Sequence, residues 1–266
     1  VECRAIVLAG GGGSRLRGCT VDSTGHHVPK QYCAVRGTQT LIHLAVARGR
    51  RLADPERVVV VVAGQHREWW EPQLAGIVAP ANIVAQPLSR GTAVGALLPL
   101  LQVLARDPGA HVVLLPADHF FRDEARLVAA IRTGLEHTYE DPSTLALIGI
   151  EPDAATSDFG YIVPQATGAA GARRVTSFVE KPPPDRAERL VAVGALWNTL
   201  ILASNGRHLL QVIRDRFPHT VSALRVATSR VEDPDCLASA LEAIYPGLTT
   251  ADLSRDVLEA GRGPMV

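Results

Sequence analysis

Two lysines stand out because the basic residues of this chain are otherwise arginines. Lys30 and Lys181 are the two lysines among 27 basic residues, and each lies beside a proline, in Pro29-Lys30-Gln31 and Glu180-Lys181-Pro182. An ammonium group is a compact point charge, whereas a guanidinium group is a broad planar fork. Lysine at these two positions therefore predicts two tight anion sites, and phosphate oxygens are the expected ligands. The alternative is that the distribution is an accident of composition.

A glycine-rich turn follows the first apolar run of the chain. Residues Leu8–Leu16 read LAGGGGSRL. Successive glycines let backbone N–H groups converge on an anion with no Cβ in the way. The turn lacks the Gly-Lys-Ser/Thr of a Walker loop and the spacing of a dinucleotide-binding fingerprint. With Arg15 near its end, it predicts a phosphate cradle with an added cation.

An acidic residue closes a second apolar run, in Pro116-Ala117-Asp118-His119. A bound triphosphate requires Mg²⁺, and this ion is commonly held by only one or two protein carboxylates. Asp118 is therefore the predicted metal ligand. The alternative is an aspartate that caps the following helix. We interpret His119 as a hydrogen-bonding neighbour and not as a general base.

Strand and helix patterns alternate around these motifs. Strands are expected at Ala5–Leu8, Val58–Ala63, Asn82–Ala85, His111–Leu115 and Leu145–Ile150, and helices at Leu41–Leu52, Glu68–Leu74, Thr92–Ala105 and Glu124–His137. This βαβ alternation predicts an α/β fold with a Rossmann-like, mostly parallel sheet and helices on both faces. Ligands of such sheets bind beyond the carboxyl ends of the strands. Gly10–Arg15, Gln86–Thr92 and Pro116–His119 should therefore lie along one edge.

The pattern changes near Asp153. Strands are expected at Tyr161–Pro164, Arg174–Val179 and Leu196–Leu202, and helices at Gly206–Arg216, Asp235–Ile244 and Ala251–Glu259. We interpret residues 1–152 as a nucleotide-binding core and residues 153–266 as a smaller lobe with C-terminal helices that completes the cleft. The two parts are expected to form one continuous domain.

The composition excludes several classes of partner. Acidic and basic residues number 27 each, so the net charge is zero, and no general attraction to nucleic acid or to a membrane surface is expected. No apolar run approaches the ~18 residues of a membrane span. Four widely spaced cysteines without a Cys-x-x-Cys pair argue against zinc and against a disulfide framework. With no charged leader before the first strand, a cytoplasmic protein is expected.

The motifs occur in a specific order along nearly the whole chain. They are Leu8–Leu16 with Pro29-Lys30-Gln31, Gln86-Pro87 with Gly91-Thr92-Ala93, Pro116–His119, Gly160-Tyr161-Ile162, Phe178–Pro182 and Leu196-Trp197-Asn198. This ordered set resembles the mannose-1-phosphate guanylyltransferases, within the sugar-phosphate nucleotidyltransferases. Each motif alone has modest specificity, but the ordered set is highly specific.

The resemblance implies a nucleoside triphosphate, GTP in the first place, and a sugar 1-phosphate, mannose 1-phosphate in the first place, as substrates. They would form a nucleotide sugar and pyrophosphate with Mg²⁺ as cofactor. The implied nucleotide contacts are Leu8, Gly10, Gly11, Gly13, Ser14, Arg15, Gln86, Gly91 and Thr92. Arg15 would meet the β- and γ-phosphates, Lys30 the α-phosphate, and Asp118 the metal. The implied sugar contacts are Gly160, Tyr161, Glu180 and Asn198, with Lys181 on the sugar phosphate.

Two departures from the family pattern bear on these expectations. The segment between Arg15 and Lys30, which includes Gly18–His27, is longer than usual and lacks the family's Trp-Pro-Leu stretch. The family's Trp-x-Asp-x-Gly motif, which supplies a second metal ligand, does not occur. Asp252 and Asp256 do not match it, and we interpret both as helix-surface residues. A tail with that motif is expected beyond Val266, and a single activity is expected because the chain has no room for the isomerase domain of long members.

Three alternatives stay open. The first is the same chemistry on another sugar 1-phosphate or with another base. The second is a glycosyltransferase, which the sequence Pro-Ala-Asp-His disfavours because such enzymes usually carry Asp-x-Asp at the metal strand. The third is a non-catalytic nucleotide-sugar-binding homologue, favoured by the missing motif and disfavoured by the retention of Lys30, Lys181 and Asp118. The oligomeric state is also open, with a homodimer as one option.

Overall fold

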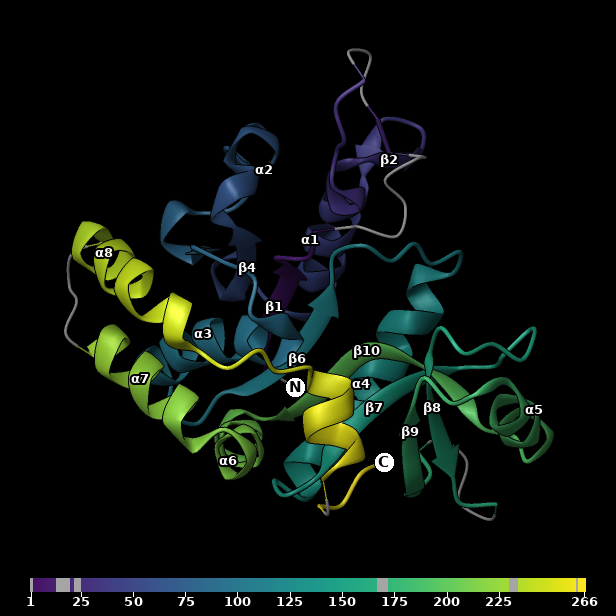
Figure 1. Ribbon diagram of the computed structural model, residues 1–266. Helices are drawn as coiled ribbons and strands as arrows, with labels where there is room; N and C mark the ends of the chain where they lie inside the picture. The colour runs from purple at the N-terminus through teal and green to yellow at the C-terminus, as the bar shows by residue number, and fades with distance from the viewer. Residues whose placement is uncertain (1, 13–19, 22–24, 167–171, 230–233, 262) are drawn as a thin grey trace.

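A mixed eight-stranded sheet forms the centre of the molecule (Figure 1). The computed structural model describes residues 2–12, 20–21, 25–166, 172–229, 234–261 and 263–266. The strands are β1 (Arg4–Ala9), β4 (Val58–Ala63), β5 (Ile83–Gln86), β6 (His111–Pro116), β7 (Leu145–Ile150), β8 (Gly160–Pro164), β9 (Val175–Glu180) and β10 (Leu196–Asn205). Their order is β5-β4-β1-β6-β10-β8-β9, and β7 pairs with β10.

Strand direction differs between the two halves of this sheet. β5, β4, β1 and β6 are parallel to one another. In contrast, β10 is antiparallel to β6, β7 and β8, and β9 is antiparallel to β8. The predicted α/β class with a parallel Rossmann-like core is confirmed. The antiparallel strands come from the second half of the chain.

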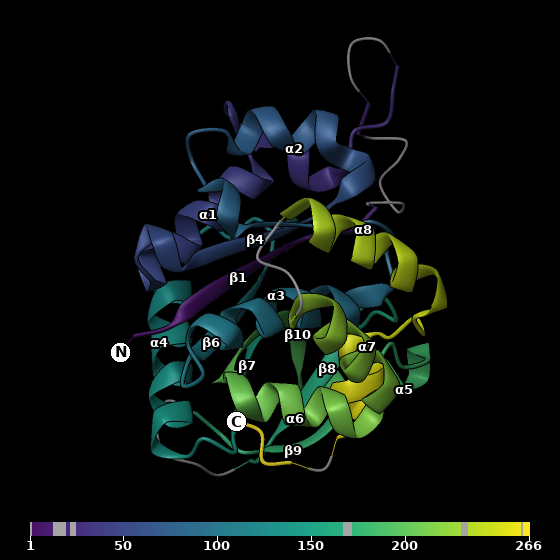
Figure 2. The same cartoon turned by 90° about the vertical axis from the view of Figure 1, so that its left-hand side faces the viewer.

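Helices cover both faces of the parallel strands. On one face lie α1 (Leu41–Leu52), α2 (Arg67–Leu74) and α4 (Glu124–Glu140), and on the other α3 (Gly91–Arg106), α6 (Gly206–Arg216), α7 (Pro218–Ser229) and the π-helix Leu253–Glu259 (η7). Figure 2 shows α1 and α3 on opposite sides of β1. α5 (Pro184–Ala192) packs on β8 and β9, and α8 (Pro234–Ile244) packs on α7. A short hairpin, β2 (Ala34–Arg36) and β3 (Gln39–Thr40), precedes α1.

β4 shows why the sheet is buried on both faces. Its sequence VVVVVA is buried at every position, and β-branched residues pack well on a pleated surface. Val59 and Val61 contribute to the core beneath α3, while Val58, Val60 and Val62 contribute to the core beneath α1 and α4. Side chains of successive strand residues point to opposite faces, so one continuous apolar run supplies both cores, as the sequence predicts.

β10 joins the two halves of the molecule. Its C-terminal part pairs with β6, and its N-terminal part pairs with β8. The pairing with β7 is interrupted between Asn198 and Leu202, and Leu200 in this interruption has φ +58°.

The described part of the chain contains no helix that is both long enough and apolar enough to span a membrane.

Candidate active site

The glycine-rich turn leaves the carboxyl end of β1 and is held from below by the Gln31 side chain. The Gln31 amide Nε2 donates to the carbonyl oxygens of Ala9, at 3.0 Å, and Gly11, at 2.8 Å. Gln31 is buried, so these hydrogen bonds are shielded from water. The sequence indicated Gln31 only as the neighbour of Lys30. Three predicted residues of the turn, Gly13, Ser14 and Arg15, lie outside the described residues.

Gln86, at the end of β5, forms the floor next to this turn. A Cβ added at Gly10 would lie 3.1 Å from Gln86 Nε2, and one at Gly95 would lie 3.4 Å from the same atom. Gln86 is therefore wedged between two backbone segments that approach closely because both carry glycine. Among the described residues, no hydrogen bond engages the Gln86 amide. Its donor and acceptor are both available to a ligand.

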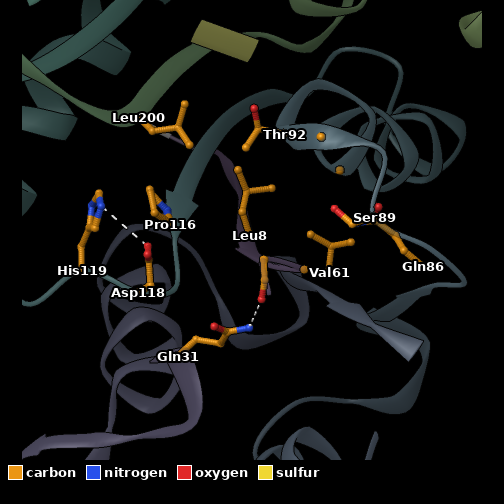
Figure 3. Close-up of a pocket in the computed structure, with 14 residues that line it drawn as sticks. Leu8, Gln31, Val61, Gln86, Ser89, Thr92, Pro116, Asp118, His119 and Leu200 are labelled. Carbon is orange, nitrogen blue, oxygen red and sulfur yellow. Dashed lines mark hydrogen bonds and ion pairs between the residues drawn. The ribbon is translucent and has the colours of Figure 1, made fainter. Parts of the chain in front are cut away.

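These residues line a cavity of ≈ 290 Å³ at the carboxyl ends of β1, β5 and β6 (Figure 3). The structure brings together seven predicted residues in its wall: Leu8, Gly10, Gly11, Gln86, Gly91, Thr92 and Asp118. His119, predicted as a neighbour of the metal ligand, also lines the wall, together with Gln31, Val61, Ser89, Gly95, Pro116 and Leu200, which had no predicted contact. In Figure 3, Asp118 and His119 lie on one side of Leu8, and Gln86 and Ser89 lie on the other. For the described residues of the three motifs, the expectation that they share one edge of the sheet is confirmed.

Asp118 lies just past the end of β6, which is anchored to β1 by a hydrogen bond from Ala117 N to Leu8 O of 3.0 Å. Lys30 Nζ is 3.6 Å from Asp118 Oδ2. The cap of the next helix, α4, is Asp123, whose side chain accepts from Arg126 N. The capping alternative for Asp118 is therefore wrong, and its carboxylate is available to the cavity.

His119 Nε2 lies 3.6 Å from Asp118 Oδ1 (Figure 3). Burial lowers the pKa of His119 below its ordinary value of 6.5, and the cations Lys30 and Arg48 lower it further, against the opposing effect of Asp118. The imidazole is therefore neutral at pH 7. It lies next to the Asp118 carboxylate without neutralising its charge, which agrees with its interpretation as a neighbour of the metal ligand.

A second cavity of ≈ 320 Å³ adjoins the first and shares Asp118 and His119 with it. Lys30 and Asn198 supply further polar groups to its wall. The remaining wall residues are Phe120, Phe121, Ile150, Phe159, Trp197 and Thr199. Asp118 lines both cavities, and Lys30 forms an ion pair with it. A negatively and a positively charged side chain therefore lie where the two cavities meet.

Glu180 and Lys181 form a third group beside the second cavity. Lys181 Nζ is 3.1 Å from Glu180 Oε1, and only 7% of the Glu180 side chain is exposed. A Cβ at Gly160 would lie 2.4 Å from Glu180 Oε2, so glycine here lets the Glu180 carboxylate approach the backbone of β8. Lys181 has φ +46°, and its N–H donates to the carbonyl oxygen of Phe159, a wall residue of the second cavity.

Tyr161 is placed differently from its predicted neighbours. The side chain is fully buried. Its hydroxyl donates to Thr156 O at 3.0 Å and accepts from Thr156 N at 3.1 Å. These bonds hold the turn before β8 and leave the phenol away from either cavity. Any ligand contact at Tyr161 would have to use the backbone.

The C-terminal segment reaches the first cavity through Thr92. The Thr92 hydroxyl donates to Asp252 Oδ2 at 3.3 Å, and Asp256 Oδ2 accepts from Asp252 N at 2.7 Å. The interpretation of Asp252 as a helix-surface residue is therefore wrong, whereas Asp256 is a half-buried residue of η7 whose carboxylate bonds to the N-terminal end of its own helix. Sequence reasoning missed the contact because Thr92 and Asp252 are 160 positions apart and no motif joins them.

Arg48 was also missed. It lies on the buried face of α1 with an exposed fraction of 1%. Its guanidinium donates to both carboxylate oxygens of Glu124, at 2.6 and 3.0 Å, and to His119 O at 3.4 Å. It also lies over the Phe121 ring, 4.8 Å from the centroid. The available signal was an arginine at a position that the helical period places among Leu41, Ala45 and Leu52.

Comparisons with known proteins agree with this geometry. A family model described as nucleotidyl transferase matches residues 4–226. The mannose-1-phosphate guanylyltransferase of Escherichia coli K12 is 32% identical over 239 residues, which cover 86% of this chain and 48% of that protein. The xanthan biosynthesis protein XanB of Xanthomonas campestris pv. campestris B100 is 29% identical over 224 residues, covering 84% and 46%. The chain thus spans about half the length of these relatives.

A solved structure shows the same arrangement. The protein named mannose-1-phosphate geranyltransferase from Thermus thermophilus superposes with a TM-score of 0.84 at 25% sequence identity, covering 100% of this chain and 74% of that one. A protein named mannose-6-phosphate isomerase from Helicobacter pylori superposes with a TM-score of 0.74 at 17% identity, covering 100% and 97%. The second likeness concerns the fold alone.

Proposed function

Because this chain belongs to the nucleotidyl transferase family, we propose that it joins a nucleoside triphosphate to a sugar 1-phosphate and releases pyrophosphate. GTP and mannose 1-phosphate are the proposed pair, since relatives that match most of the chain are named mannose-1-phosphate guanylyltransferases. The observation that carries the proposal is the Lys30–Asp118 pair, at 3.6 Å, where two cavities meet. Two reacting phosphates would have to approach each other there.

The first cavity is the proposed nucleotide site. The Gln86 amide offers one donor and one acceptor, as recognition of a base edge requires. Gly10 and Gly11 leave their backbone amides accessible to phosphate, and the Gly91-Thr92 turn at the start of α3 is proposed to meet the base and the ribose. Arg15 is proposed to meet the β- and γ-phosphates, with Gly13 and Ser14 in the same turn.

The second cavity is the proposed acceptor site. Asn198 would contact sugar hydroxyls, and the aromatic side chains of Phe159 and Trp197, with centroids 4.8 Å apart, would cover an apolar face of the sugar. The adjoining group supplies Glu180 for paired hydroxyls, Lys181 for the sugar phosphate, and the backbone of Gly160 and Tyr161. Residues 1–152 would thus serve mainly the nucleotide and residues 153–266 mainly the sugar.

The reaction requires no covalent intermediate and no general base. An oxygen of the sugar phosphate attacks the α-phosphorus in line, a new P–O bond forms, and the bond to the β-phosphate oxygen breaks as pyrophosphate leaves. The attacking phosphate is already ionised, so no proton has to move. Lys30 offsets charge at the α-phosphate, and holding both phosphates in position supplies much of the acceleration. A neutral His119 adds no competing charge.

Asp118 fits the role of a Mg²⁺ ligand. Its carboxylate is about half exposed, at 46%, lies in the wall of both cavities, and is a hard oxygen donor. The described residues contain no cluster of three or more His, Cys, Asp or Glu side chains that could hold a metal. A lone carboxylate suits Mg²⁺, which keeps several waters and takes further ligands from phosphates. When bound, the ion would neutralise phosphate charge.

We also propose that the reaction takes place in the cytoplasm. Cys3 and Cys33 are free thiols, and burial raises the pKa of Cys3 to about 11. Such thiols are unreactive and are typical of a reducing compartment. The assignment would be contradicted by fractionation that places the protein outside the cytoplasm.

Pyrophosphate release tests the proposal. Purified protein with Mg²⁺, GTP and mannose 1-phosphate should release pyrophosphate, and EDTA should stop the release. Asp118→Asn keeps the shape of the side chain and removes its charge, so it should lower turnover by orders of magnitude with little change in Tm. A screen of other triphosphates and sugar 1-phosphates decides base and sugar. Binding of GDP-mannose without turnover of any pair would favour the non-catalytic homologue instead.

A further inference from the structure

The segment 251–254 docks on the first turn of α3. Ala93 N donates to Ala251 O at 3.0 Å, and Ala251 N donates to Arg90 O at 3.0 Å. Between them, Gly91 has φ +83°, and a Cβ there would lie 2.2 Å from Ala251 O. Glycine at this position is therefore required for the segment to approach. The Arg90 side chain secures the preceding turn by donating to the carbonyl oxygens of Tyr245 and Pro246.

The next two residues fix the hydroxyl of Thr92, which lines the nucleotide cavity. Leu253 N donates to Thr92 Oγ1 at 2.8 Å, while the same hydroxyl donates to Asp252 Oδ2 at 3.3 Å. A hydroxyl has one proton and two lone pairs. With the proton and one lone pair in use, Thr92 can offer a ligand only the remaining lone pair. The group that contacts it must be a donor, such as a ribose hydroxyl or a base N–H, and not a phosphate oxygen.

Ser254 makes a corresponding contact with Asn198, a residue in the wall of the proposed sugar phosphate cavity. Asn198 Nδ2 donates to Ser254 Oγ at 3.1 Å, and Asn198 Oδ1 accepts from Leu200 N at 3.0 Å. The second bond identifies the amide oxygen, because Leu200 N is a donor. Asn198 lines the acceptor cavity and Leu200 lines the nucleotide cavity. Ser254 is buried, with 7% exposed, so its contact with Asn198 is protected from water.

The segment therefore contacts one wall of each cavity within three consecutive residues. η7, which begins at Leu253, packs against α3, α6 and β9, and Leu253, Val257 and Leu258 are fully buried in the core beneath α3. A segment anchored in this way can transmit a small displacement of Thr92 to Asn198. Neither a flexible loop nor an exposed helix would do so.

We propose that Asp252 and Ser254 are positioning residues, and that the segment 251–254 couples nucleotide binding to sugar phosphate binding. Asp252 sets Thr92 as an acceptor toward the nucleotide. Ser254 sets the amide of Asn198 toward the sugar. The coupling rests on the proposed function, whereas the hydrogen bonds that produce it can be measured without any substrate.

A pair of double-mutant cycles tests the two positioning roles. Asp252→Asn retains a side chain that can cap η7 but replaces the acceptor of Thr92 with a donor, and Ser254→Ala removes the partner of Asn198. Each should lower kcat/KM about fivefold, the effect of losing about one hydrogen bond. If the residues act through Thr92 and Asn198, Thr92→Val/Asp252→Asn should match Thr92→Val, and Asn198→Ala/Ser254→Ala should match Asn198→Ala. Additive losses would overturn the assignment.

Binding of GMP with and without mannose 1-phosphate tests the coupling, because this pair cannot react. Mannose 1-phosphate should change the Kd of GMP in the unaltered protein. The ratio of the two Kd values, without and with mannose 1-phosphate, is the coupling factor, and in Ser254→Ala it should be close to one. Glu259→Ala, on the exposed side of the same helix, is the matched control and should retain the full factor. Equal factors in all three proteins would overturn the coupling.

Amide hydrogen exchange separates this proposal from the proposed function. The Leu253 amide should exchange slowly, and Thr92→Val should speed its exchange at least about tenfold if the bond to Thr92 protects it. Glu259→Ala should leave the rate unchanged. If the protein shows this exchange pattern but neither binds nor turns over the substrates, the proposed function is wrong. The contact between Thr92 and the segment 251–254 would still be supported. Unaltered exchange in Thr92→Val contradicts that contact, whatever the activity.

Discussion

Arg48 of α1 and Glu124 of α4 form a two-point ion pair directly beneath the loop that carries Asp118. Arg48 Nη2 lies 2.6 Å from Glu124 Oε1, and the Arg48 side chain has no exposed surface. Arg48 Nη1 is buried without a hydrogen-bond partner among the described residues. A buried pair is often neutral for stability when compared with apolar residues. Its location indicates a role in fixing the loop of residues 118–124.

Arg48→Met should cost about 3 kcal/mol of stability, because it leaves Glu124 without its partner. Arg48→Met/Glu124→Gln should recover part of that loss in urea unfolding. Neither variant restores the donor to His119 O, so both should require more Mg²⁺ for half-maximal pyrophosphate release. A double variant with the unaltered Mg²⁺ requirement would show that the pair serves stability alone.

Lys30→Arg and Lys181→Arg should each lower kcat/KM at least tenfold, equivalent to about 1.4 kcal/mol of transition-state stabilisation. A planar guanidinium is too broad for a site fitted to an ammonium group. Lys30→Arg should act mainly on kcat, and Lys181→Arg mainly on the KM of the sugar phosphate. Arg126→Lys, at an exposed position on α4, is the control for a general exchange of cations. Ordinary kinetics for both lysine variants would mean that the rarity of lysine is accidental.

Leu200→Gly and Leu200→Ala should separate backbone strain from cavity shape. Leu200 has φ +58°, a conformation that costs an L-residue about 1–2 kcal/mol and that glycine adopts freely. Both variants remove the side chain from the nucleotide cavity, so they should change the KM of GTP alike. Only glycine also relieves the strain, so Leu200→Gly should be the more stable of the two in thermal unfolding. The reverse order would indicate that the positive φ is not adopted in solution.

Stability should fall as the pH decreases from 7.5 to 5.5. Burial lowers the pKa values of His66, His111, His119 and His208 below 6.5. The unfolded chain therefore takes up protons in this window that the folded protein does not, and stability is lost as the pH falls through the unfolded value. His119→Gln should reduce the slope of Tm against pH. A Tm that stays constant or rises on acidification would contradict the assignment of neutral buried histidines.

The parallel core was predictable because its signals are local. The bounds of α1, β4 and β7 agree with the sequence prediction residue for residue, since continuous apolar runs and clear helical periods specify them. α5 and α7 were missed. Both begin at a proline, Pro184 and Pro218, a residue that suggests a loop although it is favoured in the first turn of a helix.

The candidate site was predictable where a motif ends a strand and not where distant segments meet. Gly10, Gln86 and Asp118 each follow or end a buried strand, and parallel topology brings such ends to one edge. Tyr161 lies in a motif, but its hydroxyl bonds to a turn that only the folded chain defines. Asp252 and Arg48 depend on contacts between elements far apart in sequence, for which composition and spacing carry no signal.

The dependence of Thr92 on Asp252 also orders events during synthesis. When the ribosome has synthesised the glycine-rich turn, β6 and Asp118, the residue that binds the Thr92 hydroxyl, Asp252, is still missing. It follows Thr92 by 160 positions, and the Thr92 side of the nucleotide cavity stays incomplete until it has been added. Contacts of such long sequence separation form late, since the loop between them must first be ordered. The parallel core can be assembled on a nascent chain whose nucleotide site is still open. Catalytic competence would therefore have to wait until the segment 251–254 has left the ribosome.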